Sequence, residues 1–333
     1  QVFQSIDANS AQEVRGAVAD IQKAYVHHIR RAKRFIYVEN QYFLGSSTHW
    51  ERFDDKSFNV PCKHLVPFEL AMKIVNKIRQ GQPFSVYVVI PMYSEGIAQS
   101  APLQAILYWQ AQTVSMMYKK VADAIAKWGP PGAQPTDYLN FFCPANRDAV
   151  RDPSIPGDVW QSMSEDQKLL VRTRRHQIYV HSKMAIFDDE YILIGTANIN
   201  QRSMDGARDT EIAIGACEEG FVVDASGRLP QGEVSGFRLN LWAEHLGCYD
   251  PVFLRPDSLE CVRRVRQMAA ANWAAYVDPM PQYLPHGHLL AYPYTVSATG
   301  QVTPTVKFFP DHERVRAEVM GTEPLESLWL MTT

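Results

Sequence analysis

Two short apolar segments joined by an acidic turn decide the fold class: VHSKMAIFDDEYILIGTAN (residues 180–198). Each segment has the length and apolar content of a β-strand. The three residues between them leave room only for a tight turn, so we expect strands over 177–187 and 191–194 to pair antiparallel. A third strand over 211–214 is expected to follow. The sequence therefore predicts an antiparallel region of sheet at this point in the chain.

Helix and strand patterns alternate through the rest of the chain. Apolar residues three and four apart predict helices over 11–33, 67–80, 102–128, 233–246 and 259–277. Short β-branched and aromatic runs predict strands over 35–38, 84–90 and 138–143. This alternation indicates an α/β fold with a partly parallel sheet flanked by helices. We expect an exposed loop over 144–168, and beyond 280 a Pro- and Gly-rich tail lying on the domain.

Composition limits the possible functions. A length of 333 residues suits one or two domains. Lys and Arg number 33 against 36 Asp and Glu, a balance that disfavours non-specific nucleic-acid binding. The five cysteines are odd in number and widely spaced, which suits a reducing compartment better than a disulfide framework. No apolar run approaches the roughly 20 residues of a membrane span. Because the chain opens at Gln1, we expect it to be a piece of something longer.

A chemical motif lies within the opening segment. It has the pattern H-x-K-x4-D-x6-G-[ST]-x-N, formed by His181, Lys183, Asp188, Gly195, Thr196 and Asn198. Given ordinary residue usage, a chance match in a chain of this length has a probability of about 10⁻⁵. The pattern therefore indicates function rather than coincidence.

The residue types of the motif suit chemistry on a phosphate. Residues two apart in a strand share a face, so His181 and Lys183 are expected to project together. Lys183 supplies a compact cation, and His181 supplies an imidazole that can attack phosphorus or move a proton near neutral pH. Asn198 and the Thr196 hydroxyl can donate hydrogen bonds to the same anion.

Two further carboxylates have open roles. Asp188 is more simply explained as a turn residue that binds backbone than as part of the chemistry. Glu211 lies just before a predicted strand. It fits equally well a role in orienting the His181 ring and an ordinary ion pair.

The motif resembles the HKD motif of the phospholipase D superfamily. Around it, the segments IYVENQYF (36–43) and GTANINQRSMDG (195–206) resemble the eukaryotic phospholipases D. The segments YLNFFC (138–143), LWAEHLG (241–247) and FFPD (308–311) resemble the plant C2-containing type, closest to the alpha class. The resemblance covers nearly the whole chain and implies a phospholipase D-like α/β sandwich, with a mixed β-sheet flanked by helices.

The resemblance implies hydrolysis of phosphatidylcholine and related phospholipids to phosphatidic acid and the head-group alcohol, with transfer to other alcohols. In this family two motifs face each other across one site and the reaction passes through a phosphohistidine. His181 would be the general acid and base, Lys183 and Asn198 would bind phosphate, and Glu211 would orient His181. Asp188 belongs to the same motif. Glu39, Asn40, Gln41 and Thr196 would line the substrate site.

The sequence departs from the family in one respect: no other histidine is followed two positions later by lysine. The calcium-binding C2 segment is also missing. We therefore expect this chain to supply the second motif, completed by an amino-terminal half or by a second copy. Residues 1–255 would form the second half of the catalytic domain, and 256–333 a helix and extended tail packed on it. Calcium dependence is implied by the family, without assignable ligands and with no metal in the chemical step.

Other interpretations remain open. A truncated module that binds phospholipid or a protein partner without turnover is the main alternative, and a nucleic-acid phosphodiesterase is the third. The basic cluster of Lys168, Arg172, Arg174 and Arg175 is either a solvated surface or a contact for anionic lipid. His286 and His288 lack the neighbours of a metal site. Cysteine usage and resemblance together favour a cytoplasmic protein that visits membranes peripherally.

Overall fold

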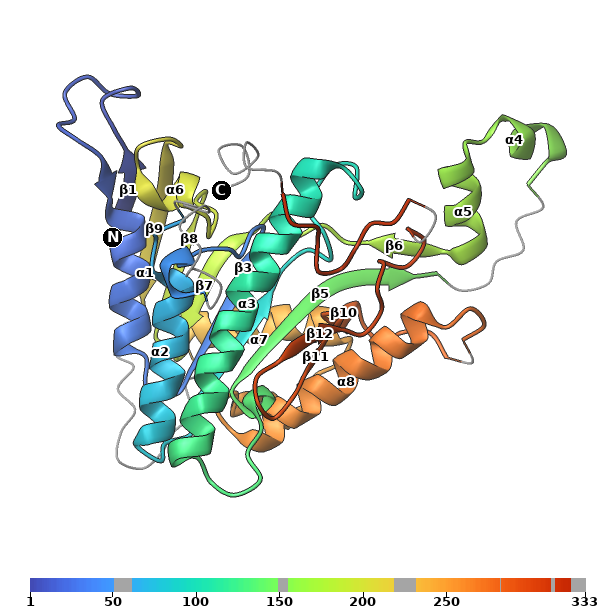
Figure 1. The fold of residues 1–333 in the computed structure, drawn as a ribbon. Helices are drawn as coiled ribbons and strands as arrows, with labels where there is room; N and C mark the ends of the chain where they lie inside the picture. Colours follow the sequence, from blue (N-terminus) through green and yellow to red (C-terminus); the bar gives the residue numbers. More distant parts are fainter. Residues whose placement is uncertain (51–61, 149–154, 219–231, 282, 313–314, 325–333) are drawn as a thin grey trace.

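A computed structural model describes residues 1–50, 62–148, 155–218, 232–281, 283–312 and 315–324. Its centre is one large mixed sheet with the strand order β10-β5-β4-β3-β7-β8-β9-β1-β2 (Figure 1). The neighbours β3, β4 and β5 are parallel, and the other pairs on this path are antiparallel. The strands are β1 (Val2–Ile6), β2 (Val18–Ala19), β3 (Phe35–Asn40), β4 (Ser85–Val89), β5 (Leu139–Arg147), β6 (Arg175–Gln177), β7 (Lys183–Phe187), β8 (Tyr191–Gly195), β9 (Glu211–Cys217), β10 (Leu289–Ala291), β11 (Tyr294–Val296) and β12 (Val302–Pro304).

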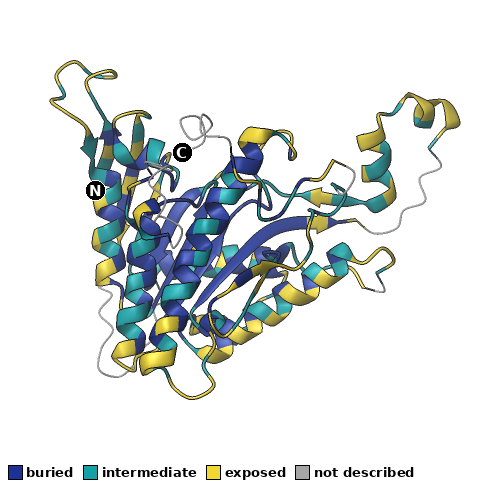
Figure 2. Cartoon of the chain, viewed as in Figure 1, coloured by how far each residue is buried: buried dark blue, intermediate teal, exposed yellow. Residues whose placement is uncertain are grey.

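Helices cover both faces of the sheet, so its central strands are buried (Figure 2). The helices are α1 (Asp20–Arg31), α2 (Val66–Arg79), α3 (Ala101–Trp128), α4 (Gly157–Ser162), α5 (Glu165–Thr173), α6 (Gln201–Asp205), α7 (Glu233–Leu246) and α8 (Leu259–Val277), with 3-10 turns η1 (Ser47–His49), η2 (Pro135–Asp137) and η3 (Pro251–Leu254). Helices α1, α2 and α3 pack on one face with Ile36, Val38 and Ala185. Helices α7 and α8 pack on the other with Tyr37 and Met184. Burial of apolar side chains on both faces drives this layered arrangement.

Most of the predicted elements are confirmed. The helices over 67–80, 102–128, 233–246 and 259–277 and the strands over 35–38, 84–90 and 138–143 appear within a few residues. The mixed sheet flanked by helices and the antiparallel β7–β8–β9 region also appear as expected. In the described part of the chain, no helix is long and apolar enough to cross a bilayer.

Two predicted elements are wrong in extent. The helix over 11–33 begins only at Asp20, because β1 and β2 form an antiparallel pair before it and Gly16 has a φ of 77°, outside the helical region. The single strand over 177–187 is two strands, since the chain leaves β5 after Gln177 and joins β3 at Lys183. His181 therefore lies just before β7, not inside a strand.

Two predicted irregular regions contain regular structure. Within 144–168, β5 continues to Arg147, and α4 and the start of α5 follow; residues 149–154 lie outside the described part. In the expected tail, β10 adds a strand to the main sheet beside β5, and β11 pairs with β12. The division at residue 255 stays a prediction, although α8 and β10 both pack into the layers formed by the first 255 residues.

Candidate active site

The motif residues other than Asp188 meet at one edge of the sheet because neighbouring strands there run in alternating directions. Asn40 at the end of β3 is paired with Lys183 at the start of β7. The start of β7 lies beside the end of β8, and the end of β8 lies beside the start of β9. The ends of four strands, which lie between Asn40 and Glu211 in the sequence, thus share one edge.

Lys183 is the best-defined member of the site. Its side chain is buried, and its ammonium group donates to Oε1 of Gln41 and to the carbonyl oxygen of His181, each at 2.7 Å. An ammonium group has three N–H donors, and the third has no acceptor among the described residues. Burial lowers the pKa of Lys183, and the nearby Glu211 carboxylate partly opposes that shift. One donor thus remains for an anion.

His181 lies beside Lys183 with its side chain exposed to solvent. Its ring stacks on that of Tyr179, with ring centroids 6.2 Å apart and planes at 30°. The Tyr179 hydroxyl accepts a hydrogen bond of 2.7 Å from Nε2 of Gln41. Oε1 of the same Gln41 amide accepts from the Lys183 ammonium. Gln41 therefore connects the lysine to the tyrosine that supports the histidine.

Glu211 has partners other than the histidine. The Ser203 hydroxyl donates to its Oε1 at 2.6 Å, and the Thr196 hydroxyl donates to its Oε2. Among the described residues, no hydrogen bond joins Glu211 to the His181 ring. Thr196 also accepts a hydrogen bond of 3.0 Å from the amide of Ile212, so it ties β8 to β9. Glu211 is placed to act on Lys183 through its charge, and the expected orientation of His181 by Glu211 is not seen.

The amides of Asn198 and Asn40 have different settings. Asn198 is partly exposed, and its Oδ1 is buried with no partner among the described residues. Asn40 is fully buried, and its Oδ1 accepts from the amides of Tyr42 and Ile199 at 3.2 and 3.0 Å. Asn40 thus fixes the loop that carries Asn198 and does not line an accessible surface.

Asp188 lies at the opposite end of β7 from His181 and Lys183. Its carboxylate accepts from the amides of Lys33, Arg34 and Phe35 at 2.6, 2.7 and 2.9 Å. It begins the turn to β8 with a φ of 59°, a conformation that Asp tolerates better than most residues. The structure does not bring Asp188 to the site; it gives this residue the turn role that the sequence left open.

Glu39 lies at the same sheet edge but on the α7–α8 face. Its buried carboxylate accepts from Tyr37, from Ser182 and from the ring of His245, which in turn contacts His288. Sequence reasoning missed Ser182 and His245. The alternation of side chains along a strand, which places Ser182 opposite His181 and Lys183, was the available signal for the first. The LWAEHLG segment was the signal for the second.

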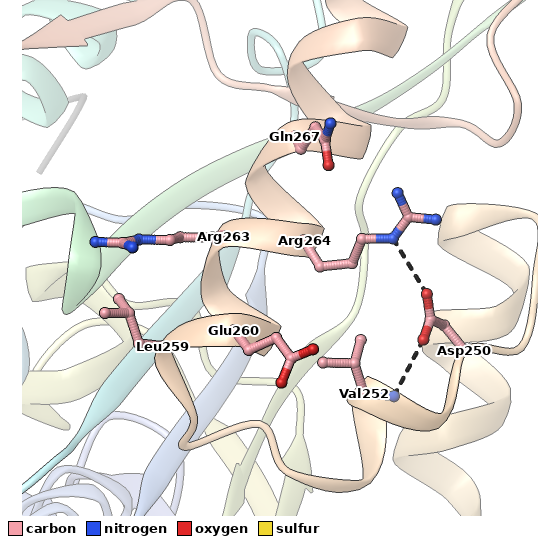
Figure 3. Close-up of a pocket in the computed structure, with 7 residues that line it drawn as sticks. All are labelled: Asp250, Val252, Leu259, Glu260, Arg263, Arg264 and Gln267. Carbon is pink, nitrogen blue, oxygen red and sulfur yellow. Dashed lines mark hydrogen bonds and ion pairs between the residues drawn. The ribbon is translucent and has the colours of Figure 1, made fainter.

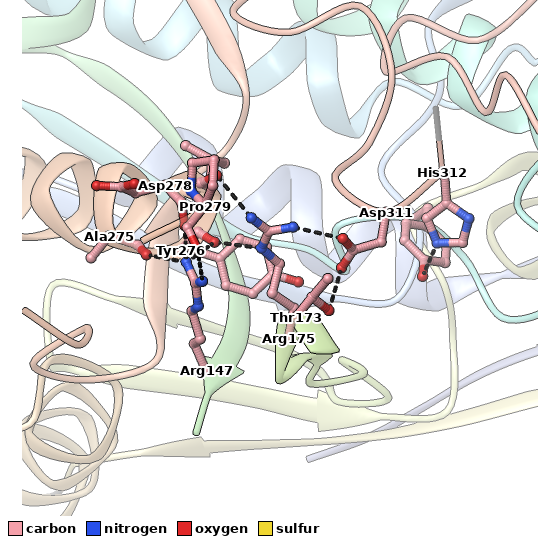
Figure 4. A network of polar contacts seen from close by, with 11 residues as sticks. Arg147, Thr173, Arg175, Ala275, Tyr276, Asp278, Pro279, Asp311 and His312 are labelled. Carbon is pink, nitrogen blue, oxygen red and sulfur yellow. Dashed lines mark hydrogen bonds and ion pairs between the residues drawn. The ribbon is translucent and has the colours of Figure 1, made fainter. Parts of the chain in front are cut away.

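The basic cluster is accounted for by contacts within the chain. Lys168 pairs with Glu165, Arg172 lies over the Trp160 ring, and Arg174 donates to the carbonyl of Asp148. Arg175 binds Asp311 and the carbonyls of Tyr276 and Val277 at the end of α8 (Figure 4). Arg147, which the sequence did not single out, binds the carbonyls of Ala275, Tyr276, Asp278 and Pro279 in the same network. These arginines hold the end of α8 and the FFPD segment together.

A pocket of about 760 Å³ lies away from the motif, at η3 and the start of α8 (Figure 3). Arg264 and Asp250 form an ion pair of 3.1 Å across it. No motif residue lines this pocket, so it is not part of the site. Among the described residues, no group of three or more His, Cys, Asp or Glu side chains is placed to hold a metal ion.

Known proteins resemble this chain in sequence over most of its length. A family model described as phospholipase D matches residues 1–321. The chain is 48% identical to phospholipase D alpha 1 of Oryza sativa subsp. japonica and 47% identical to phospholipase D alpha 2 of Arabidopsis thaliana, each over 306 residues. Both alignments cover 91% of this chain but only 37% of the relative. The chain thus spans little more than a third of the length of these relatives.

A solved structure with similarity to the chain is Nuc from Salmonella typhimurium, a phospholipase D family member. It is 13% identical with a TM-score of 0.28, over 65% of this chain and 81% of Nuc. The assignment depends instead on the family model, which spans the motif, and on the plant relatives, which confirm the resemblance seen in the sequence. The chain belongs to the phospholipase D family.

Proposed function

We propose that this chain supplies one half of a phospholipase D active site, which hydrolyses phosphatidylcholine and related phospholipids to phosphatidic acid and the head-group alcohol. One observation carries the proposal: beside the exposed ring of His181, the buried ammonium of Lys183 has one N–H donor with no acceptor among the described residues. A fixed cation next to an imidazole is the pair that phosphodiester cleavage needs.

We propose the following roles for the residues of the site. Lys183, with Asn198 beside it, binds the non-bridging oxygens of the phosphodiester. A histidine from the complementary half attacks phosphorus, and the bond to the head group breaks as His181 donates its proton to the leaving alcohol. His181 then takes a proton from a water molecule, or from another alcohol, that attacks phosphorus and breaks the P–N bond. Gln41 holds Lys183, while Glu211 and Thr196 shape the edge next to it.

The second catalytic histidine comes from the remainder of a longer protein in this proposal. The plant relatives are much longer than this chain, which supports that source. An exposed apolar stripe on β1, β8 and β9 also supports a protein partner: Val2, Ile194, Ile212 and Ile214 are 45–69% exposed and lie on one face. A second copy of the chain is the other possible source. Calcium dependence and a cytoplasmic, peripheral-membrane location belong to the proposal for the longer protein.

The test is turnover of phosphatidylcholine vesicles with calcium and ethanol, followed by choline release and phosphatidylethanol formation. We expect activity when the chain is combined with the amino-terminal part of the rice relative, and loss of at least about 100-fold on His181→Ala, the lower end of general acid–base effects. Activity of the chain alone, with a sedimentation mass of two copies, would identify a dimer. Vesicle binding without turnover in any combination would favour the non-catalytic module and overturn the proposal.

A further inference from the structure

We infer that Glu39, His245 and His288 are positioning residues, which act through Ser182 to set the direction of the His181 and Lys183 side chains. The inference builds on the proposed function, since it concerns the same site. The inference adds a series of hydrogen bonds from Ser182 through Glu39 and His245 to His288. These contacts lie on the α7–α8 face of the sheet, opposite to His181 and Lys183. Glu39, His245 and His288 act through others and do not touch the substrate.

Glu39 is the centre of the network. The residue is only 7% exposed, and its two oxygens accept three hydrogen bonds: from the Tyr37 hydroxyl at 2.6 Å, the Ser182 hydroxyl at 2.8 Å and Nε2 of His245 at 2.8 Å. Burial alone raises the pKa of Glu39, but these donors, above all His245, outweigh it, so the pKa lies below its usual value. The group is therefore a buried carboxylate anion with its charge compensated.

The two histidines extend the network to the carboxyl-terminal region. Because Nε2 of His245 donates to Glu39, its Nδ1 is left to share the hydrogen bond of 2.9 Å with Nε2 of His288. Burial lowers the pKa of His288, and the neighbouring His245 lowers it further, so this ring is neutral near pH 7. The contact with His288 holds the ring plane of His245, because the hydrogen bond at one ring nitrogen sets the role of the other.

A close backbone crossing holds these rings in place. The amide of His288 donates to the carbonyl of His245 at 3.0 Å. A Cβ on Gly247, where φ is 73°, would lie 1.9 Å from the carbonyl oxygen of His286. A Cβ on Gly287 would lie 2.5 Å from the carbonyl oxygen of His245. Both glycines are thus required by the crossing, which explains why the HLG and HGH segments each contain one.

The link to the site is Ser182, which lies between the two motif residues. In an extended chain neighbouring side chains point to opposite faces, so a hydroxyl anchored to Glu39 on one face turns His181 and Lys183 to the other. His181 precedes β7, and among the described residues no strand pairs with it. The hydrogen bond from Ser182 to Glu39 therefore fixes the backbone here in place of sheet pairing. A side chain displaced by about 1 Å can lower a rate by about 100-fold, which sets the scale of the effect.

The experiment compares Ser182→Ala with Ser182→Thr in the completed enzyme. We expect Ser182→Ala to lower kcat by about 10- to 100-fold while KM rises less than about threefold, because the reacting groups are misplaced but still present. Ser182→Thr, which keeps the hydroxyl, is expected to recover most of kcat. Glu39→Gln and Gly287→Ala should lower kcat in the same way, the latter by disturbing the crossing.

Asp189→Asn is the matched control. Asp189 forms a buried ion pair with Arg238 on α7, the helix that carries His245, but it lies at the far end of β7. We expect this variant to lower the melting temperature and leave kcat per folded molecule unchanged. An unchanged kcat for Ser182→Ala, no recovery by threonine, or an equal loss of kcat in Asp189→Asn would each overturn the inference.

A second readout needs no turnover: the Kd of inorganic phosphate for the chain itself, measured by calorimetry. If Lys183→Ala raises this Kd and Ser182→Ala raises it about threefold, both proposals stand; a change of that size is under 1 kcal/mol. If only Lys183→Ala raises it, the site binds phosphate and the positioning inference fails alone. If neither variant changes it, the proposed function fails as well.

Discussion

The ammonium of Lys183 and the side-chain amide of Gln41 lie 2.7 Å apart, and this contact orients the one cation of the candidate motif. The amide has a fixed orientation because its nitrogen donates to the Tyr179 hydroxyl, which leaves its oxygen to face Lys183. The flexible Lys183 side chain is thereby held at the sheet edge, with one N–H donor that has no acceptor among the described residues. Pre-organisation of this kind lowers the entropy lost when an anion binds.

The first prediction concerns that contact. Gln41→Ala is expected to raise the Kd of inorganic phosphate several-fold, because Lys183 loses its acceptor and its fixed position. Gln41→Glu is expected to raise it further, since a carboxylate would pair with the ammonium and repel the phosphate. Calorimetric titration measures both. Gln110→Ala is the control, because Gln110 also donates to a tyrosine hydroxyl but does so within the core; an equal effect there would contradict the prediction.

The second prediction uses the lowered pKa of Lys183. Phosphate binding needs the protonated amine, so affinity should fall as the pH rises through the Lys183 pKa, and this fall should come below 10.5, the ordinary lysine value. Lys183→Arg keeps its charge throughout this range and should bind phosphate with little change at alkaline pH. Titrations from pH 7 to about pH 10.5 check this. Parallel curves for the two proteins would show that another group controls binding.

The third prediction separates Asp188 from the chemistry. Asp188→Ala removes the acceptor of three backbone amides, and unfolding in urea should become easier by about 2–4 kcal/mol. Asp188→Asn, which keeps one acceptor oxygen, should lose less. The activity of each variant, divided by its folded fraction, should stay near the wild-type value. A large loss of activity in a variant of unchanged stability would instead give Asp188 a direct role.

The fourth prediction concerns acid stability. The His64 ring is buried and donates from Nε2 to the carbonyl of Leu44, and burial lowers the pKa of His64 from 6.5 to about 4. The unfolded chain therefore takes up this proton more readily. The contribution of neutral His64 to the free energy of unfolding is fully present above pH 6.5 and is lost as the pH falls towards about 4. The full loss is about 3 kcal/mol.

Urea unfolding between those pH values tests the prediction. His64→Gln, which keeps a donor but cannot titrate, should reduce the loss of stability on acidification. His176→Gln, a change at an exposed position of β6, is the control and should leave the dependence in place. An unchanged slope for His64→Gln would show that the ring is already protonated in the folded protein.

The family, the class of fold and most of the elements could be predicted from the sequence by itself. Periodicity located α2, α3, α7 and α8, and the short acidic turn established that β7 and β8 pair antiparallel. The spacing of His181, Lys183 and Asn198 predicted chemistry on a phosphate, and for these residues that chemistry stays a prediction. The resemblance in the flanking segments then identified the plant-type relatives.

Only the tertiary structure decided which groups meet. Glu39 is joined to His245 across 206 residues, and Lys183 to Gln41 across 142. Glu211 lies with Thr196 and Ser203 instead of with His181, and Asp188 lies at the far end of its strand. The physical reason is that a hydrogen bond needs positions within about 3 Å. Local propensity fixes a strand, but strand order and layer packing set which residues from distant segments come that close.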